Sequence, residues 1–308
     1  MGIILYEEPK LNNPVMIVGW PGIGNIGLIT VDTLRATTEA EEFGEIESCD
    51  FFYPRKVIIK TGLLEGLEFP TNKFYFKRFE KNDLIFFLGE EQPKKQTASG
   101  YAEGEEAYRM ANLVLNVAEK FGCRRIYTSG AAVAFTHHSM ISRVWAVPNT
   151  EKLMEEIKKY PNTVLMSQVE GRGGQGFISG LNGLLLGVAR KRGFEGVCLM
   201  GEIPVYFQGL LIPYPGASKS VLKVFGEILG IKIDFGKFDE KYQGMEKKIE
   251  DIYSQIPAEV KEQLDKLKEI SYIRQTDLEP MSEENRKRLW EEISEFLKKG
   301  DGRDEGAI

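Results

Sequence analysis

The chain has 308 residues, 42% of them hydrophobic, which is enough to bury a large core. Its net charge of −6 disfavours nucleic-acid binding, because phosphates attract a basic surface. No apolar run approaches the roughly 20 residues of a membrane span, and the N-terminus lacks a signal-peptide layout, so we expect a cytoplasmic protein with no membrane contact. Three widely spaced cysteines without a C-x-x-C pair predict neither a metal site nor a disulfide framework.

A strand, a glycine loop and a helix open the chain. Val15–Val18 has the pattern of a buried strand, and apolar residues from Ile23 to Leu34 recur at helical spacing. Glycines at a helix start expose backbone N–H groups, so the loop is a candidate anion or partner site, and a purely structural tight turn is the alternative. The candidate loop residues are Pro21, Gly22, Gly24, Asn25 and Gly27.

The spacing of these glycines also matches the dinucleotide-binding fingerprint. That fingerprint requires a following strand that ends in an acidic residue about 20 positions on. Thr37–Asp50 is too polar for such a strand, and the aromatic and β-branched runs of Phe51–Phe79 indicate antiparallel ribbons instead. We therefore expect no nicotinamide or flavin, and no other cofactor.

Strands and helices alternate through the middle of the chain. This order predicts an α/β fold with three layers, in which helices cover both faces of a mostly parallel, mixed sheet. The apolar patterns place strands at 83–88, 125–128, 141–147, 163–169 and 197–200, and helices at 107–121, 151–160, 181–192 and 217–229.

Two of these strands end alike, in Gly89-Glu90 and in Gly201-Glu202 with Pro204 close behind. If both strands are parallel, both glutamates lie at the carboxyl edge of the sheet, where open α/β sheets bind ligands. Two carboxylates there could serve acid/base chemistry or bind hydroxyl groups. Alternatively, they could cap the N–H groups of loops.

A second glycine loop, Gly171–Gly176, carries an arginine. Arg172 could bind a phosphate or carboxylate through two hydrogen bonds, or pair with an acidic neighbour. We include Gly173 and Gly174 with it as candidate site residues.

His137 and His138 are adjacent, and adjacent side chains rarely ligate one metal, so we expect ordinary surface or loop histidines. The chain has no G-x-S-x-G elbow, and Ser129 has no identifiable histidine partner. The sequence therefore predicts no catalytic residues.

Charged amphipathic helices follow from Phe238 onward. We expect a core domain over residues 1–237, a helical extension over 238–299 and a disordered tail over 300–308. The extension could brace the core or make an oligomer contact.

Four motifs occur in order: WPGIGNIG, LGEEQP, GQGFISGLNGLLLGVARKRG and MGEIPVY. With them, Asn13–Ile233 resembles the proteasome assembly chaperone family, specifically an archaeal-type member of the group named after its second chaperone. The resemblance implies a fold similar to nucleoside phosphorylases, homo-oligomers, and binding of proteasome α subunits during ring formation. It brings no catalytic residues.

Members that dock on the proteasome ring end in a hydrophobic residue, a tyrosine and any residue. Here the similar triplet, Ile252-Tyr253-Ser254, is internal, so we do not expect docking by that route. The alternative function is a nucleoside-phosphorylase-like enzyme or small-molecule sensor. It would bind an anion through the first glycine loop and Arg172, with Glu90 or Glu202 for hydroxyl groups or proton transfer.

Overall fold

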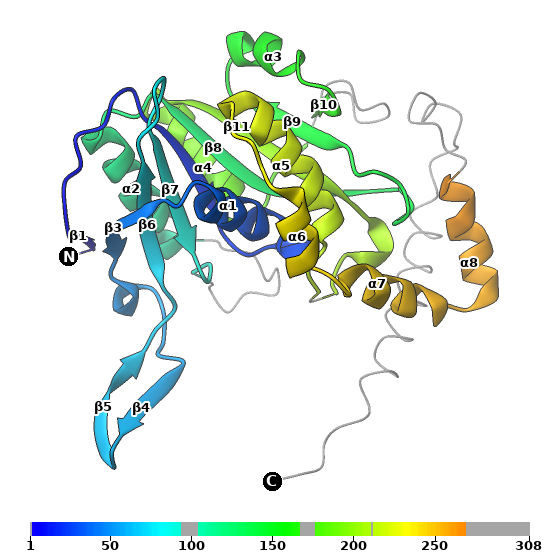
Figure 1. Ribbon diagram of the computed structural model, residues 1–308, viewed down its shortest axis with the longest axis horizontal. Coiled ribbons are helices and arrows are strands. Elements are labelled where there is room, and N and C mark those ends of the chain that lie inside the picture. Colours follow the sequence, from blue (N-terminus) through cyan, green and yellow to red (C-terminus); the bar gives the residue numbers. More distant parts are fainter. Residues whose placement is uncertain (1, 94–103, 167–175, 211, 269–308) are drawn as a thin grey trace.

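The computed structural model describes residues 2–93, 104–166, 176–210 and 212–268. A nine-stranded sheet forms the body, with helices on both of its faces (Figure 1). The strand order is β1-β3-β6-β7-β2-β8-β11-β9-β10. The predicted α/β fold with a mixed sheet is confirmed.

Four central strands, β7, β2, β8 and β11, are parallel, and antiparallel strands flank them. The antiparallel ribbons predicted over 51–79 are confirmed by the pairing of β4 (Lys56–Lys60) with β5 (Leu63–Glu68) and of β6 with β7. The stretch 37–50, which we considered too polar for a strand, nevertheless contains β3, because β1 and β6 both pair antiparallel with it. The strands are β1 (Ile3–Leu5), β2 (Val15–Gly19), β3 (Glu41–Ile46), β6 (Asn72–Lys77), β7 (Leu84–Gly89), β8 (Arg125–Ala134), β9 (Val144–Pro148), β10 (Thr163–Leu165) and β11 (Glu195–Pro204).

Two apolar cores lie on opposite faces of the sheet. Along β2, Ile17 belongs to one core while Met16 and Val18 belong to the other, because successive strand side chains point to opposite faces. Helices α1 (Ile26–Thr37) and α5 (Pro215–Leu229) cover the first face, and α2 (Glu105–Lys120) and α4 (Gly180–Lys191) cover the second. A shorter helix, α3 (Glu151–Ile157), begins at Thr150, whose hydroxyl accepts the N–H of Leu153.

Strands β8 and β11 run farther than the sequence predicts. They pair in parallel over ten residues each, from Arg125–Glu195 to Ala134–Pro204. The expected strand ends at 128 and 200 were wrong, because the two strands continue to pair with each other beyond Gly130 and Gly201. Glu202 therefore lies inside a strand, opposite Ala132.

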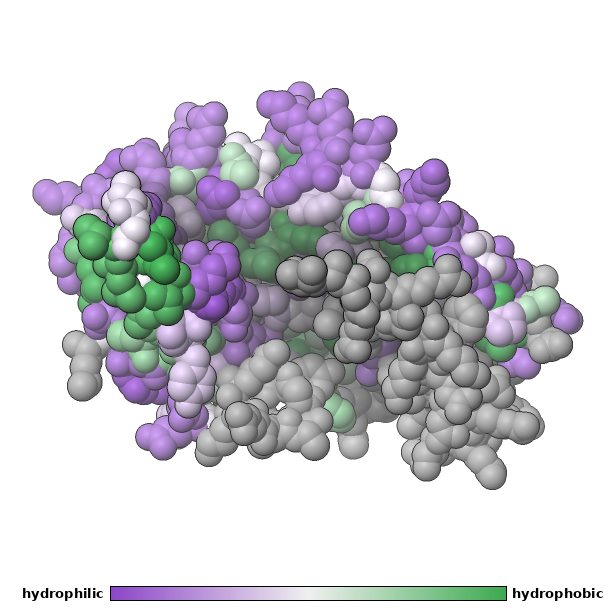
Figure 2. Space-filling view, turned by 90° about the horizontal axis from the view of Figure 1, so that it is seen from below, coloured by the Kyte–Doolittle hydropathy of each residue, from purple (hydrophilic) through white to green (hydrophobic). Residues whose placement is uncertain are grey.

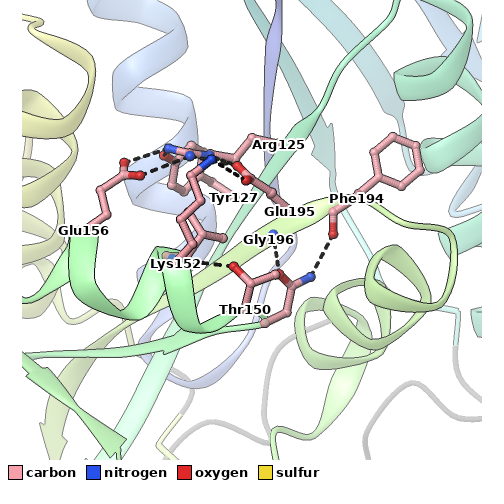
Figure 3. A network of polar contacts seen from close by, with 10 residues as sticks. Arg125, Tyr127, Thr150, Lys152, Glu156, Phe194, Glu195 and Gly196 are labelled. Atoms are coloured by element: carbon pink, nitrogen blue, oxygen red, sulfur yellow. Dashed lines mark hydrogen bonds and ion pairs between the residues drawn. The ribbon is translucent and has the colours of Figure 1, made fainter.

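A polar network joins the amino ends of these two strands to α3 (Figure 3). The Arg125 guanidinium donates to Glu156 at 2.7 Å and to Glu195 at 2.8 Å, and Lys152 pairs with Glu195 at 3.0 Å. Arg125 and Lys152 lower the pKa of Glu195. Since these charges neutralise one another, we assign the network a structural role.

A two-stranded hairpin of β4 (Lys56–Lys60) and β5 (Leu63–Glu68) projects from the body between β3 and β6 (Figure 1). Its turn residues Thr61 and Gly62 both have positive φ, 50° and 82°, as a type I′ turn requires. We call this hairpin the arm.

Three short helices end the described chain: α6 (Phe235–Lys241), α7 (Met245–Ser254) and α8 (Ala258–Asp265). Their buried residues Phe238, Ile249 and Tyr253 pack in the same core as Ile17 of β2. The boundary at 237/238 remains a prediction, and the tail at 300–308 lies outside the described residues. Single-turn 3₁₀ helices are η1 (Ile23–Asn25), η2 (Ser48–Asp50), η4 (Val205–Phe207) and η5 (Lys266–Lys268).

Among the described helices, none combines the length and apolar character needed to cross a bilayer.

Candidate functional site at the carboxyl edge of the sheet

The carboxyl ends of β7, β2, β8 and β11 meet at one edge, which Figure 2 views from below. The described candidate residues all lie along it. The first glycine loop follows β2, Glu90 follows β7, and Gly201, Glu202 and Pro204 belong to the last four residues of β11. The candidates Arg172, Gly173 and Gly174 fall outside the described residues.

The first glycine loop packs closely against its neighbours. A Cβ atom added to Gly27 would lie 2.3 Å from the carbonyl oxygen of Ser129 in β8, so only glycine lets α1 approach the sheet this closely. The Gly24 carbonyl accepts the N–H of Tyr214 at 2.8 Å, and the Gly22 carbonyl accepts that of Asn25 at 2.9 Å. These contacts fit the tight-turn alternative, while Gly22 itself stays exposed. Anion binding here remains a prediction.

Glu202 is fully buried and ion-paired. Its Oε1 accepts from the Arg143 guanidinium at 2.7 Å and from the Trp145 indole N–H at 2.6 Å, while its Oε2 accepts the backbone N–H of Arg143 at 3.2 Å. Both carboxylate oxygens therefore hold β9 and the residue before it against β11. Glu202 thus caps a backbone N–H group, the second of the two roles considered from the sequence, and it also forms a buried ion pair with Arg143.

Glu90 is half-exposed and also accepts a backbone N–H, that of Thr71, at 3.1 Å. It binds Arg55 at the root of the arm at 2.8 Å, and Glu91 binds the same guanidinium at 2.8 Å. Because β2 and β8 separate β7 from β11, Glu90 and Glu202 lie about 14 Å apart along the edge. The two carboxylates do not converge on one site.

Gln92 joins two segments of the edge and was not among the predicted site residues. Its amide N–H donates to the Pro21 carbonyl at 2.5 Å, and its amide oxygen accepts the N–H of Leu181 in the first turn of α4 at 2.9 Å. The signal was present, since Gln92 lies in the LGEEQP motif, but an uncharged amide gave no chemical reason to select it.

His137 and His138 lie in the loop after β8, as predicted, but their side chains are buried. The expectation of surface histidines was wrong because α7 covers them. The Tyr253 ring packs 4.4 Å from that of His138 and 5.1 Å from that of His137, and His138 Nδ1 lies 2.8 Å from the Tyr206 hydroxyl. Burial lowers the pKa of His137 to about 4 and raises that of Tyr206. Tyr253, the tyrosine of the internal triplet, is thus enclosed.

Over the described ranges, no three His, Cys, Asp or Glu side chains gather closely enough to hold a metal ion. Large apolar side chains do emerge at the edge, in the segments that flank β8, β9 and α4. Phe177 is 89% exposed, Ile141 73% and Phe135 38%. Exposed apolar side chains that gather on one surface are typical of protein contacts.

The chain is similar to several known proteins. An uncharacterised protein of Methanocaldococcus jannaschii is 29% identical over 246 residues, which cover 80% of this chain and 84% of that protein. The crystal structure of PbaB, an archaeal proteasome activator from Pyrococcus furiosus, is 28% identical with a TM-score of 0.66. The match covers 81% of this chain and 97% of PbaB.

PbaA from the same organism, an archaeal homologue of a proteasome-assembly chaperone, superposes with a TM-score of 0.59 over 87% of this chain and 98% of its own. At 20% identity this likeness concerns the fold. The model of the PAC2 family matches residues 16–253, a span that runs from β2 through α7. The chain therefore belongs to the PAC2 family.

Proposed function

We propose that this protein acts as a proteasome-assembly-chaperone-like factor: a cytoplasmic, non-enzymatic homo-oligomer that binds proteasome α subunits or another cytosolic protein. The observation that carries the proposal is the family match over 16–253, supported by the likeness to an archaeal proteasome activator over 97% of that activator's chain.

The carboxyl edge is the surface we assign to the partner. Phe177, Ile141 and Phe135 expose apolar area there, and the half-exposed Pro21 and exposed Gly22 of the first glycine loop lie on the same edge. Gln92 joins this loop to α4, so these two segments of the surface are held together before a partner arrives. A preformed apolar surface binds with a smaller loss of conformational entropy than a flexible one.

The test mixes the purified protein with proteasome α subunits of its own organism and follows native mass by light scattering on a sizing column. We expect a mixed complex, or faster formation of α rings. The double variant Phe177→Asp, Ile141→Asp should weaken the complex at least tenfold, because each change places a charge in an apolar contact.

Phe79→Asp is the matched control, since Phe79 is 38% exposed in the turn between β6 and β7, at the opposite, amino edge of the sheet. It should bind as the wild type does. No complex with the wild-type protein would refute the proposed partner, and equal loss in the control would refute the assigned surface.

The alternative, a nucleoside-phosphorylase-like enzyme or sensor, has less support from the geometry. Glu202 is engaged by Arg143 and Trp145, and Glu90 by Arg55, at separate points of the edge. A thermal-shift screen with nucleosides, nucleotides and phosphate distinguishes the two functions. Stabilisation by one of them at millimolar concentration would favour the enzyme or sensor.

A further inference from the structure

The arm has two chemically different faces. In its antiparallel register Val57 lies opposite Leu67 and Ile59 opposite Leu64, and a bulge between Ile58 and Ile59 keeps both pairs on one side. We call these four side chains the apolar face of the arm. The other face carries all four charged side chains of the arm, in the ion pairs Lys56–Glu68 at 3.5 Å and Lys60–Glu65 at 2.8 Å, together with Ile58 and Leu63.

Nothing in the described chain covers the apolar face. Val57 is 53% exposed, Ile59 66%, Leu64 73% and Leu67 52%. Figure 2 shows the consequence as a concentration of apolar surface, green at the left of the view, where the arm projects toward the reader. In the central strands of the body sheet, by contrast, Ile17 and Phe86 are completely buried.

This contrast indicates that the apolar face is covered in the working protein. Alternation of apolar and charged side chains is typical of a strand that packs on one side and meets water on the other. A hairpin of two strands is marginal in water by itself and needs packing on its apolar face for stability. The arm needs this packing whenever the protein is folded. This favours a partner that covers the apolar face permanently over one that binds it transiently.

We propose that a second copy of this chain covers the arm, with the apolar faces of two arms packed against each other. Two small sheets that meet face to face pack about 10 Å apart, and a two-fold contact presents the same surface from each copy.

Charge supports this occupant. The four ionised side chains of the arm, Lys56, Lys60, Glu65 and Glu68, pair with one another, so the arm is neutral although the whole chain carries −6. Two arms can therefore approach without repulsion. Contacts between permanent copies are also more apolar than transient ones, as this face is.

Contacts at the base of the arm fix its direction relative to the body. Arg55, directly before β4, is bound by Glu90 and Glu91 behind β7 at 2.8 Å each, and its N–H donates to the Glu68 carbonyl at 2.6 Å. The candidate residue Glu90 thereby gains a role: it fixes the arm to the body. The inference names the self-contact of the homo-oligomer in the proposed function, but it does not depend on the identity of the client.

The test compares two substitutions on one strand. Ile59→Glu places a charge in the proposed contact, and Ile58→Glu places the same charge on the opposite face one residue away. Native mass is measured by light scattering without any client, against a single-chain mass of 34.9 kDa. We expect the wild type and Ile58→Glu to form the same oligomer, and Ile59→Glu to fall to half that mass or less.

Ile59 is 66% exposed in the single chain, so Ile59→Glu should fold, and circular dichroism checks this. Leu64→Lys is a second variant of the same face and should also halve the mass. A monomeric wild type, or unchanged mass in both face variants, would overturn the proposal.

Cross-linking tests the face-to-face geometry. Leu64→Cys in a Cys49→Ser background should form a covalent dimer with a thiol cross-linker of about 10 Å span, the distance between packed sheets. Lys60→Cys on the charged face is the control and should stay at least fivefold less cross-linked. Equal cross-linking of the two cysteines would contradict the arrangement.

Client binding is measured separately on the same variants. Loss of α-subunit binding by Ile59→Glu with unchanged self-association would assign the arm to the client and overturn this inference alone. Loss of the oligomer on Ile59→Glu, in a protein whose wild type binds no α subunit, would uphold the arm contact and refute the proposed function.

Discussion

The two ends of the carboxyl edge are held in opposite ways. At the arm, Arg55 and Glu90 form an ion pair with side chains 36% and 46% exposed. At the other end Glu202 is fully buried with Arg143, and Tyr253 of α7 packs on two enclosed histidines. Both glutamates follow a glycine in the sequence, yet one stands just past its strand and the other inside a ten-residue ladder. The pairing of neighbouring strands, more than the local motif, sets the environment of a side chain.

Glu202→Ala should show the largest difference between the two ends. The change removes the carboxylate that both Arg143 and Trp145 use, and loss of one partner of a buried ion pair costs about 3–5 kcal/mol in the free energy of unfolding. Glu90→Ala is the matched change in the exposed pair and should cost less than about 1 kcal/mol. Urea unfolding measures both, and similar losses would remove the contrast.

Gly27→Ala tests the close packing of α1 against β8, between the two ends of the carboxyl edge. The added methyl carbon meets the Ser129 carbonyl at 2.3 Å, so α1 must shift, at a cost of about 2–3 kcal/mol. Gly22→Ala is the control, because its added carbon has no neighbour within 4 Å and its φ of −165° suits alanine. The control should change stability by less than about 0.5 kcal/mol. A tolerated Gly27→Ala would show that the loop is not held by close packing.

The α7 end should respond to pH. Burial lowers the pKa of His137 from 6.5 to about 4, so between these values the unfolded chain binds more protons than the folded one. The free energy of unfolding should therefore fall by about 1–2 kcal/mol as pH drops from 6.5 to 4. The titratable groups that face the ring are His138, Asp265, Lys268 and Tyr253.

His137→Gln is the control for this prediction. Its unfolding free energy should depend less on pH between 6.5 and 4.5, as urea titrations at these two pH values will measure. Asp265, whose pKa is lowered by Lys268 from 3.8, titrates below that interval. A variant with the same slope as the wild type would show that His137 does not carry the dependence.

The smallest effect belongs to the arm root. Arg55→Gln removes two half-exposed ion pairs, so global stability should change by less than about 1 kcal/mol. Hydrogen exchange should nevertheless rise severalfold in peptides that cover Lys56–Glu68, since the arm is then attached less firmly. High salt on the wild type should act in the same direction. Unchanged exchange in both experiments would show that the ion pairs do not hold the arm.

Much of the fold was predictable because it depends on local pattern. The apolar residues of β7 and the apolar face of α2 are buried, as their sequence patterns predict, since side-chain periodicity sets which face of an element is apolar. The candidate site was predictable in its location only. Glu90 and Glu202 do lie at the carboxyl edge, but their separation depends on β2 and β8 lying between their strands.

The sequence by itself determined the alternation of strands and helices in the middle of the chain, the glycine loop and the family motifs, because each depends on residues close together in the chain. Tertiary structure alone decided that β8 and β11 pair for ten residues, that α7 encloses His137, and that the arm leaves an apolar face uncovered. The physical reason is that burial and strand pairing are set by contacts between segments far apart in sequence. Periodicity gives a strand its faces, and only its neighbours decide which face meets water.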